Sequence, residues 1–592
     1  MNRHGRWRSA AVMRGHIHEG SNPSFYYAQV WFSTSHRGGL ISSVRRLPGW
    51  MHLVGLFAGC GVLATCSAGA IQQPGRTFHV SPRGDDTAAG LSPATAWRSL
   101  ARASTEVLRP GDRLLLEGGA RFAGTLELGP QDAGNATDPV VIAAYGSGGP
   151  VIDAGDAPAM VIADTAGIEI NDVTAVGSAQ AYQRWAGILL TNEQPDGDLL
   201  EHVHLNRVDV SGFKRGIEVA ASGTVGFRDV LIANASLHDN LEAGFASHGP
   251  EFSVDSPAYA HEDVVLRRVA SYRNVGDRAN TTRNTGSGGF LGSVRRALVE
   301  QCRFFDNGAS SAATEGPLGV WAYDSTGVVI QQNASYRNRT AATDGGGFGL
   351  DINVSDSVLQ YNLSYDNDGP GYQLYTWQAN DAHTRNTVRF NISRDDARRT
   401  VYGAVTVLGR VSSSDVYQNT VLLTASTARV RPPVVLVGAE ASEVSLRNNI
   451  FVTDGAGALV SAPALLPAAV VLQGNDYHAG GGPWVVQWGD QAYVGLDAWR
   501  AATGQELLGA EPTGLAQDPG FADPDAALDT APAGSDLPAA APGLRLVPAS
   551  PLIGAGLDLP GRFGIEPGPL DFFGTPLAGA TTTAGAHRPA GA

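Results

Sequence analysis

The sequence predicts an all-β protein that folds as a parallel β-helix, a solenoid whose successive coils stack on one another. Strand-like segments recur from about residue 165 with a spacing near 30 residues, which suits three short strands and their turns per coil. Two features repeat with them, an asparagine or small residue in one turn and a glycine at the start of one strand. We expect a helix to cover the first coil.

Length and composition limit the fold classes and the kinds of partner that this chain can have. A chain of 592 residues is long enough for several ordinary domains or for one long solenoid. Its hydrophobic content of 43% is too high for a disordered chain. The net charge of -15 argues against a general nucleic-acid partner.

The first 70 residues are expected to lie outside the fold. Residues 1–43 have features of neither a signal nor a domain, and we interpret them as translated upstream of the true start. Residues 44–70 read as a signal peptide, with a basic start, an apolar run and a small-residue cleavage site. We therefore expect export, either secreted or periplasmic, with no transmembrane segment. Leu63-Ala64-Thr65-Cys66 also resembles a lipoprotein box, which leaves an anchor at Cys66 as an alternative.

Residues 71–165 are expected to form an N-terminal cap and the first strands. Ser92-Pro93 predicts the start of an amphipathic helix over Ala94–Val107. Short apolar runs bounded by turn residues predict strands at Thr77–Val80, Arg113–Leu116, Val140–Tyr145 and Val151–Asp153. A mature chain cut after Ala70 keeps only Cys302, so neither a disulfide nor a cysteine metal site is expected.

The segment FHVSPRGDDTAAGLSPATAWRSLARA…LRPGDRLLLEGG resembles the opening of secreted right-handed parallel β-helix proteins of the pectate-lyase-like class. The resemblance implies right-handed coils and a helix over the open end of the stack. Residues 481–592 are expected to form the last coils and a cover rich in Pro, Gly and Ala, which resembles the closing segment of such proteins.

Residues 166–480 are predicted to form the regular coils. One column of residues recurs every 26 to 35 positions and is mostly asparagine. An amide can bond its own turn and the amide one coil away, so we expect a stacked ladder. The predicted column is Asn171, Asn206, Asn234, Val269, Cys302, Asn333, Asn362, Asn391, Asn419, Asn449 and Asn475.

A glycine column predicts which side chains face outward. Glycine begins strands at Gly216, Gly244, Gly289, Gly319, Gly347 and Gly371. Alternation then turns the first and third following residues inward, among them Phe290, and the second and fourth outward, among them Leu291. The expected outer stripe carries Glu218, His248, Trp321, Tyr323, Asp351, Gln373 and Tyr375.

Outward aromatic, amide and carboxylate side chains suit a sugar chain, so the expected partner is a polysaccharide bound by a monomer. We assign substrate binding to Glu218, Trp321, Tyr323, Gln373 and Tyr375, joined by Arg273 and Arg283 near a predicted inserted loop at residues 275–288. A second insertion, at residues 249–262, is expected to wall the same cleft.

Three mechanisms remain open. Elimination from an acidic polysaccharide, which we favour at this stage, needs cations and a base, and Lys214 and His248 are candidates. Hydrolysis needs two carboxylates on one bond, which Asp351 with Asp324 or Asp344 would provide. The third possibility is a glycan-binding or adhesive β-helix without catalysis. The resemblance implies calcium in some relatives, but no calcium-loop motif is present, so the cofactor stays unknown and no metal ligand is predicted.

Overall fold

The structure is a computed structural model that describes residues 75–589 without 179–183, 377–381, 425–430, 456, 465–469, 529–532, 535 and 578–581. Residues Pro74–Ala592 form one compact unit. The predictions of an upstream extension, a signal peptide and an anchor at Cys66 fall outside the described residues. No helix within the described ranges is long and apolar enough to cross a membrane.

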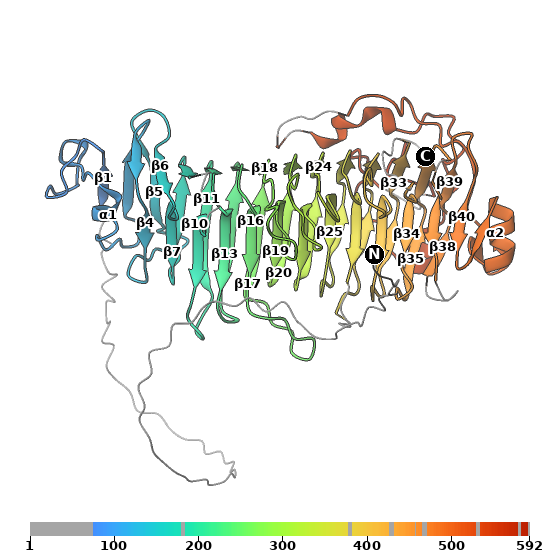
Figure 1. Ribbon diagram of the computed structural model, residues 1–592, viewed down its shortest axis with the longest axis horizontal. Helices are drawn as coiled ribbons and strands as arrows, with labels where there is room; N and C mark the ends of the chain where they lie inside the picture. Colours follow the sequence, from blue (N-terminus) through green and yellow to red (C-terminus); the bar gives the residue numbers. More distant parts are fainter. Residues whose placement is uncertain are drawn as a thin grey trace, which may run out of the picture. The chain divides into compact units, whose positions relative to one another are not determined.

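Three parallel sheets run the length of the stack, and each coil from β2 to β40 contributes one strand to each sheet (Figure 1). Sheet A contains β1 (Thr77–Val80), β2 (Arg113–Glu117), β5 (Val140–Tyr145), β8 (Ile168–Asn171), β11 (Leu200–Asn206), β14 (Phe227–Ala233), β17 (His261–Arg267), β20 (Val294–Glu300), β23 (Thr326–Gln331), β26 (Val358–Gln360), β29 (Thr387–Arg389), β32 (Asp415–Tyr417), β35 (Val444–Arg447) and β38 (Val470–Gln473).

Sheet B contains β3 (Arg121–Ala123), β6 (Val151–Gly155), β9 (Thr174–Gly177), β12 (Asp209–Ser211), β15 (Ser236–His238), β18 (Ala270–Tyr272), β21 (Arg303–Phe305), β24 (Ala334–Tyr336), β27 (Leu363–Tyr365), β30 (Ile392–Arg394), β33 (Thr420–Leu423), β36 (Ile450–Thr453) and β39 (Asp476–His478).

Sheet C contains β4 (Leu126–Leu128), β7 (Met160–Ala163), β10 (Ala186–Asn192), β13 (Arg215–Ala221), β16 (Ala243–His248), β19 (Ser287–Gly292), β22 (Leu318–Tyr323), β25 (Gly346–Leu350), β28 (Tyr372–Tyr375), β31 (Val405–Leu408), β34 (Val435–Val437), β37 (Val460–Ala462), β40 (Val486–Trp488) and β41 (Gln491–Tyr493). Only β41 pairs antiparallel in this sheet. A separate short hairpin joins β42 (Leu507–Leu508) to β43 (Glu511–Pro512).

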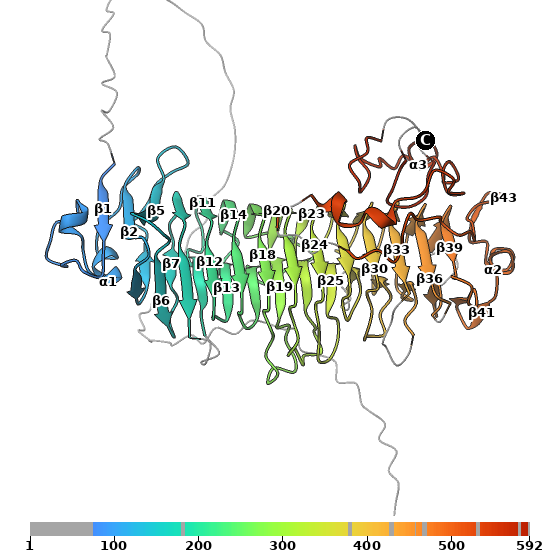
Figure 2. The same cartoon turned by 90° about the horizontal axis from the view of Figure 1, so that it is seen from above.

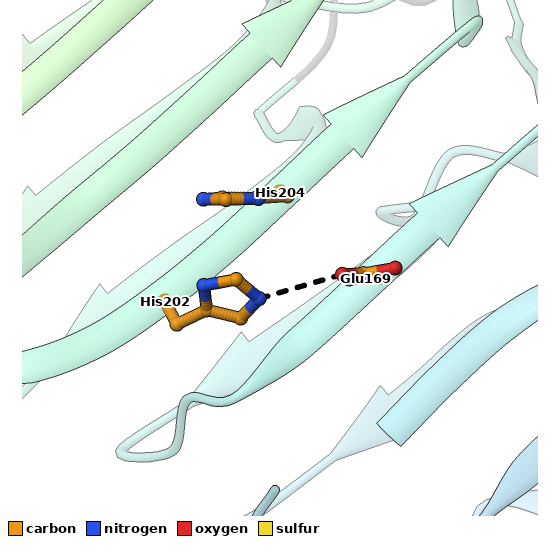
Figure 3. Close-up of side chains that lie close together, drawn as sticks. All are labelled: Glu169, His202 and His204. Carbon is orange, nitrogen blue, oxygen red and sulfur yellow. Dashed lines mark ion pairs between the residues drawn. The ribbon is translucent and has the colours of Figure 1, made fainter. Parts of the chain in front are cut away.

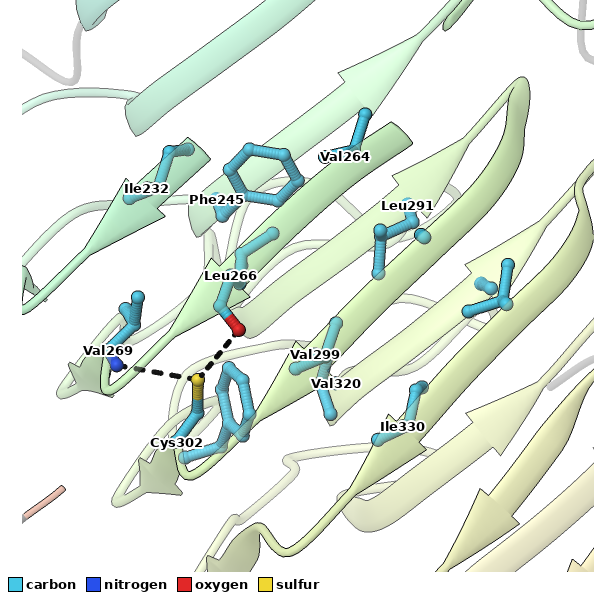
Figure 4. Packing of buried hydrophobic residues seen from close by; sticks show 14 of the residues in the cluster. Ile232, Phe245, Val264, Leu266, Val269, Leu291, Val299, Cys302, Val320 and Ile330 are labelled. Carbon is cyan, nitrogen blue, oxygen red and sulfur yellow. Dashed lines mark hydrogen bonds between the residues drawn. The ribbon is translucent and has the colours of Figure 1, made fainter. Parts of the chain in front are cut away.

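The interior of the coils is one continuous apolar core, built from alternate residues of all three sheets. Figure 4 shows Phe245 of β16, Leu266 of β17 and Val320 of β22 pointing into it. The predicted strands near the N-terminus are confirmed as β1, β2, β5 and β6. The predicted parallel β-helix is therefore confirmed.

The cap over the first coil is shorter than predicted. The expected helix over Ala94–Val107 is instead a 3-10 turn, Pro93–Thr95, followed by α1 (Leu100–Ala103). Between them Trp97 is extended, because its N–H donates to His79 O at 2.9 Å and its carbonyl accepts from Ser81 N at 2.8 Å. A bridge to β1 therefore overrides the helical pattern, and α1 alone covers the core.

The predicted column is confirmed from Val269 onward, since Val269 N–H donates to Cys302 Sγ at 3.4 Å and the asparagines follow from Asn333. Asn333 Nδ2 donates to Asn362 Oδ1 at 3.0 Å, and the same contact repeats at each coil down to Asn475. These side chains are fully buried. Cys302 fills the preceding rung (Figure 4), and its N–H donates to Asn333 Oδ1 at 2.8 Å. The ladder pairs polar groups that would each cost about 1–3 kcal/mol if buried alone.

The upper part of that column was predicted in the wrong register. Strand pairing aligns Asn206 with Asn171 and with Ala233, two residues before the buried rung. Asn171, Asn206 and Asn234 instead bond one another on the surface. The true rungs in these coils are apolar: Val173, Val208 and Ala235.

A second buried ladder was not predicted. It bonds the amides of Asn240, Asn274, Asn307, Asn338 and Asn367 in turn, and ends at the carboxyl group of Asp396. Burial raises the pKa of Asp396 to about 7.

The C-terminal segment covers two different surfaces. Helix α2 (Leu496–Thr503) closes the last coil, where Trp499 is fully buried against the end of the core. The predicted cover packs along the outer face of sheet B, with Leu544, Leu552 and Phe572 against side chains of β24 to β36 (Figure 2). It includes two 3-10 turns, Leu537–Ala540 and Pro542–Leu544, and α3 (Leu559–Phe563).

The outer face of sheet A is occupied differently, by cross-coil ion pairs such as Arg267 with Glu300 and Arg296 with Asp263. The outer face of sheet C is the one that carries the predicted stripe.

Candidate functional site

Two rows of side chains lie next to each other on the outer face of sheet C. The strand register aligns the first row as Glu218, Ala246, Phe290, Trp321, Gly349 and Gln373. The same register, two residues on, aligns the second row as Ala220, His248, Gly292, Tyr323, Asp351 and Tyr375. Neighbouring strands lie about 4.8 Å apart. The predicted stripe residues therefore share one face.

One strand of the stripe was predicted one residue out of register. Phe245 pairs with Gly289 and Ala246 with Phe290, so Phe290 faces outward and Leu291 faces the core. The sequence GSGGFLG offers three glycines before Phe290, and Gly288 rather than Gly289 is equivalent to Gly244. Phe290 consequently joins the site.

Asp344 and Asp351 bracket β25 and form the acidic part of the site. Asp344 Oδ2 accepts from Gly316 N at 2.8 Å, and Asp351 Oδ1 accepts from Ile352 N at 2.9 Å. Burial raises the pKa of Asp344 to about 6. Burial, and then the negative charge of Asp344, raise the pKa of Asp351 well above its ordinary value. Both side chains are only half-buried, so they keep a path to solvent.

Two more carboxyl groups lie around this pair. Burial raises the pKa of Asp324 to about 6, although its Oδ1 accepts from Asn353 Nδ2 at 2.6 Å. Loss of hydration raises the pKa of Glu315 as well. The charges of Glu315 and Asp324 both add to the raised pKa of Asp351. The charges of the other three acidic groups thus all act on Asp351.

Two tyrosines complete the acidic part. The Tyr402 hydroxyl donates to Asp344, and burial raises its pKa. Burial and the charge of Asp351 raise the pKa of Tyr375 to about 12. Both phenols therefore stay protonated at neutral pH and can donate hydrogen bonds.

The other end of the stripe is an ion-paired cluster around Arg215. Its guanidinium contacts Glu218 Oε1 at 2.5 Å and Glu242 Oε2 at 3.0 Å. Burial alone would raise the pKa of Glu218, but the positive charge of Arg215, joined by that of Lys214, outweighs it and holds the pKa low. Lys214 Nζ lies 3.5 Å from Glu242. The cations at this end are therefore matched by carboxylates.

His248 is neutral at physiological pH. Its Nε2 lies 3.3 Å from Glu218 Oε1, yet burial lowers its pKa to about 4. Its neutral imidazole can therefore donate or accept a hydrogen bond at this end of the site.

An aromatic cluster joins the two ends. Phe290, Trp321 and Tyr323 pack with ring centroids 5.3 to 6.2 Å apart, and Trp321 and Tyr323 stay partly exposed. Trp321 Nε1 donates to Ser287 Oγ at 3.1 Å, which fixes the indole. Tyr323 lies over Gly292, where any side chain would overlap its ring.

The other predicted site residues differ in how close they lie to the stripe. Gln373 is on the stripe but 2% exposed. Arg283 is close enough to Glu315 to lower its pKa. Arg273 lies away from the stripe, just after β18 in sheet B, where it pairs with Asp239 at 2.6 Å. It follows a strand of another sheet, so its closeness in sequence to the inserted loop was misleading.

Both predicted insertions approach the acidic part. From the segment 275–288, Asn284 N–H donates to the Glu315 carboxylate. From the segment 249–262, the charge of Glu251 helps to raise the pKa of Asp324. That second loop also borders a pocket of about 430 Å³ at the next corner of the coils, with Tyr259 and Arg385 in its wall.

Glu315 and Tyr402 were missed. Glu315-Gly316 precedes β22 as Asp344-Gly345 precedes β25, so the recurrence of an acidic residue and glycine before a sheet C strand was the available signal. Tyr402 precedes β31 and had no comparable pattern. For calcium, no close group of three carboxylate or imidazole ligands occurs around Asp351 among the described residues.

The comparisons with known proteins agree with the fold. A model of the right-handed β-helix region matches residues 186–421. A lacto-N-biosidase of Bifidobacterium longum subsp. longum is 23% identical over 482 residues, covering 64% of this chain but 29% of the relative. The chain therefore spans less than a third of that protein.

Similar solved structures include a GH136 lacto-N-biosidase from Eubacterium ramulus, at 17% identity and a TM-score of 0.48, with 61% of this chain and 65% of that chain covered. A pectate lyase matches at 16% identity and a TM-score of 0.44, with 87% and 96% covered. Together, the matched family model and the three-sheet topology identify this chain as a right-handed parallel β-helix protein.

Proposed function

We propose that this protein is a glycoside hydrolase that cleaves a glycan bound along the outer face of sheet C, with Asp344 and Asp351 as the catalytic pair. One observation carries the proposal. Two half-buried carboxyl groups flank β25 beside partly exposed aromatic rings, both have raised pKa values, and the charge of Asp344 contributes to the raised pKa of Asp351. Glycoside hydrolysis needs such a pair, one protonated and one ionised.

The hydrogen bonds and charges around Asp344 and Asp351 assign different catalytic roles to the two carboxyl groups. Asp344 accepts hydrogen bonds from Gly316 N and the Tyr402 hydroxyl, which both favour its ionised form. Asp351 has fewer donors and feels the charge of Asp344, so its pKa rises further. Near neutral pH, Asp351 holds the proton that the leaving oxygen needs. Asp344 then acts either as the nucleophile or as the base that activates water.

Asp324 is the weaker partner for Asp351. The charge of Asp344 raises the pKa of Asp351 more than the charge of Asp324 does. Asp324 Oδ1 is also engaged by the amide of Asn353 at 2.6 Å. We assign Asp324 to holding Asn353 in place.

Elimination fits the site less well. A lyase must neutralise a uronate carboxylate beside the base that removes the α proton. Here Arg215 is bound by Glu218 and Glu242, and Lys214 lies beside Glu242. The acidic groups at the other end would repel a uronate. A neutral glycan is therefore the better substrate.

The relative from Bifidobacterium longum supports the same class, because it is named lacto-N-biosidase, a glycosidase. Trp321 and Tyr323 supply the rings on which pyranose faces stack. We further propose that the protein is exported and acts as a monomer on a glycan outside the cytoplasm, which the signal-like residues 44–70 support.

Product analysis tests the proposal. The full protein is incubated with an aryl lacto-N-bioside, neutral oligosaccharides and polyuronates. We expect new reducing ends from a neutral glycan without the ultraviolet absorbance of an unsaturated sugar. An unsaturated product would establish elimination instead, and binding without any product would establish a binding protein.

A further inference from the structure

A second cluster of chemically active side chains lies on sheet A, apart from the glycan site. Glu169 comes from β8, and His202 and His204 come from β11 (Figure 3). Asp229 comes from β14, so three consecutive coils contribute. The register places His204 directly beside Glu169. The side chains of His202 and His204 are 9% and 24% exposed, and that of Glu169 is 34% exposed.

The two imidazoles are oriented by one carboxylate. Asp229 Oδ2 lies 2.9 Å from His202 Nδ1, and Asp229 Oδ1 lies 2.9 Å from His204 Nε2. Because an ionised carboxylate only accepts, both of these ring nitrogens donate their protons to it. In the neutral imidazoles, the lone pairs then stand on His202 Nε2 and His204 Nδ1.

The lone pair of His202 has no hydrogen-bond partner among the residues that the structure describes. Its Nε2 is buried and lies 3.5 Å from Glu169 Oε1 (Figure 3). A nitrogen lone pair facing a carboxylate is repulsive unless a cation or a proton lies between them. One ligand atom from each of Glu169, His202 and His204 lies within 4.8 Å of the other two.

These distances suit a metal ion. Zn²⁺ binds imidazole nitrogen and carboxylate oxygen at about 2.0–2.2 Å in tetrahedral sites. Two ligands of one tetrahedron then stand roughly 3.4 Å apart, close to the 3.5 Å between His202 Nε2 and Glu169 Oε1. Asp229 would supply the outer carboxylate that orients metal-binding histidines.

We propose that Glu169, His202 and His204 bind one Zn²⁺ or a similar divalent transition-metal ion, oriented by Asp229, and that this ion ties β8 to β11. Two nitrogen donors select against Ca²⁺ and Mg²⁺, which prefer oxygen ligands. Solvent supplies the remaining ligand position through the exposed side of Glu169. The site lies on another face from Asp351, so its role is in stability.

Zinc binding is measured on the full chain without a purification tag, after chelator treatment, by competition with a chromophoric chelator. We expect His204→Ala and Glu169→Gln to weaken the binding of one Zn²⁺ at least about tenfold. Glu169→Gln keeps the shape of the side chain and guards against a folding defect. Added Zn²⁺ should raise the melting temperature of the wild type but not of either variant.

The matched control is His238→Ala. His238 also lies among carboxylates, but both ring nitrogens are already paired, with Asp239 at 2.6 Å and Asp209 at 3.4 Å. This variant should bind Zn²⁺ as the wild type does. Co²⁺ should give the visible spectrum of a four-coordinate site in the wild type and in His238→Ala, and lose it in His204→Ala.

Two results would overturn the proposal. One is a wild type that takes up no more Zn²⁺ than His204→Ala, which would mean that a proton on His202 satisfies Glu169. The other is an equal loss of binding in His238→Ala. Excess Ca²⁺ should not displace Zn²⁺, and displacement would contradict the assignment to a transition metal.

Discussion

Replacing Asp344 by asparagine should damage activity and improve stability at the same time. Folding raises the pKa of this carboxyl group from 3.8 to about 6. The folded state therefore binds the proton more tightly than the unfolded state, and the group costs stability as pH rises from about 4 to above 6. One pKa unit corresponds to about 1.4 kcal/mol, so the full cost is at most about 3 kcal/mol.

An amide at position 344 does not titrate and can still accept from Gly316 N. We expect Asp344→Asn to melt a few degrees higher than the wild type at pH 7.5 and at the same temperature near pH 4. Its turnover of a neutral glycan should fall at least about a hundredfold, since it loses the ionised member of the pair. Thermal unfolding at the two pH values and initial rates provide the two measurements.

The control for this variant is Asp306→Asn. Asp306 pairs with Arg337 at 2.8 Å in a surface turn beyond β21, away from sheet C. It should keep wild-type activity. The reasoning is refuted if Asp344→Asn retains activity within threefold, or if its stability relative to the wild type is no higher at pH 7.5 than at pH 4.

Three further changes test other parts of the structure. Trp321→Ala should raise KM about tenfold or more with little change in kcat, because it removes a stacking surface; an unchanged KM would place the sugar elsewhere. His248→Ala should also act mainly on KM, and a large loss in kcat would move the chemistry to its end of the stripe. Asn362→Ala should cost about 3 kcal/mol in chemical denaturation, because buried partners at both neighbouring coils lose their bonds. Asn206→Ala, which removes the partly exposed pair, should cost less than 1 kcal/mol, and equal costs would contradict the ladder.

Much of the fold was predictable because its signals repeat. The column from Asn333 to Asn475 recurs every 26 to 30 residues, so an error at one turn is corrected at the next. The prediction failed where a repeat carried competing residues. The residue type matched the pattern at Asn171, Asn206 and Asn234. The buried rungs at those coils are Val and Ala, which carry no distinctive signal in the sequence.

The site was partly predictable for the same reason. Alternation after a glycine placed Trp321, Tyr323 and Asp351 on one face, but three consecutive glycine or serine positions before Phe290 left its register undecided. Glu315 and Tyr402 lie in turns, whose directions depend on contacts between coils. Arg273 is the opposite case. Its nearness in sequence to the inserted loop predicted a position beside the site, but the strand that it follows belongs to sheet B.

The most direct test of the central claim is the rate of Asp351→Asn on two substrates that differ in leaving group. If Asp351 is the general acid, cleavage of a natural oligosaccharide should fall by about 10²- to 10⁴-fold. Cleavage of the matching nitrophenyl glycoside should fall far less, because its leaving group needs no proton. Equal losses on both substrates, or none on either, would contradict the assignment of Asp351 and with it the proposed carboxylate pair.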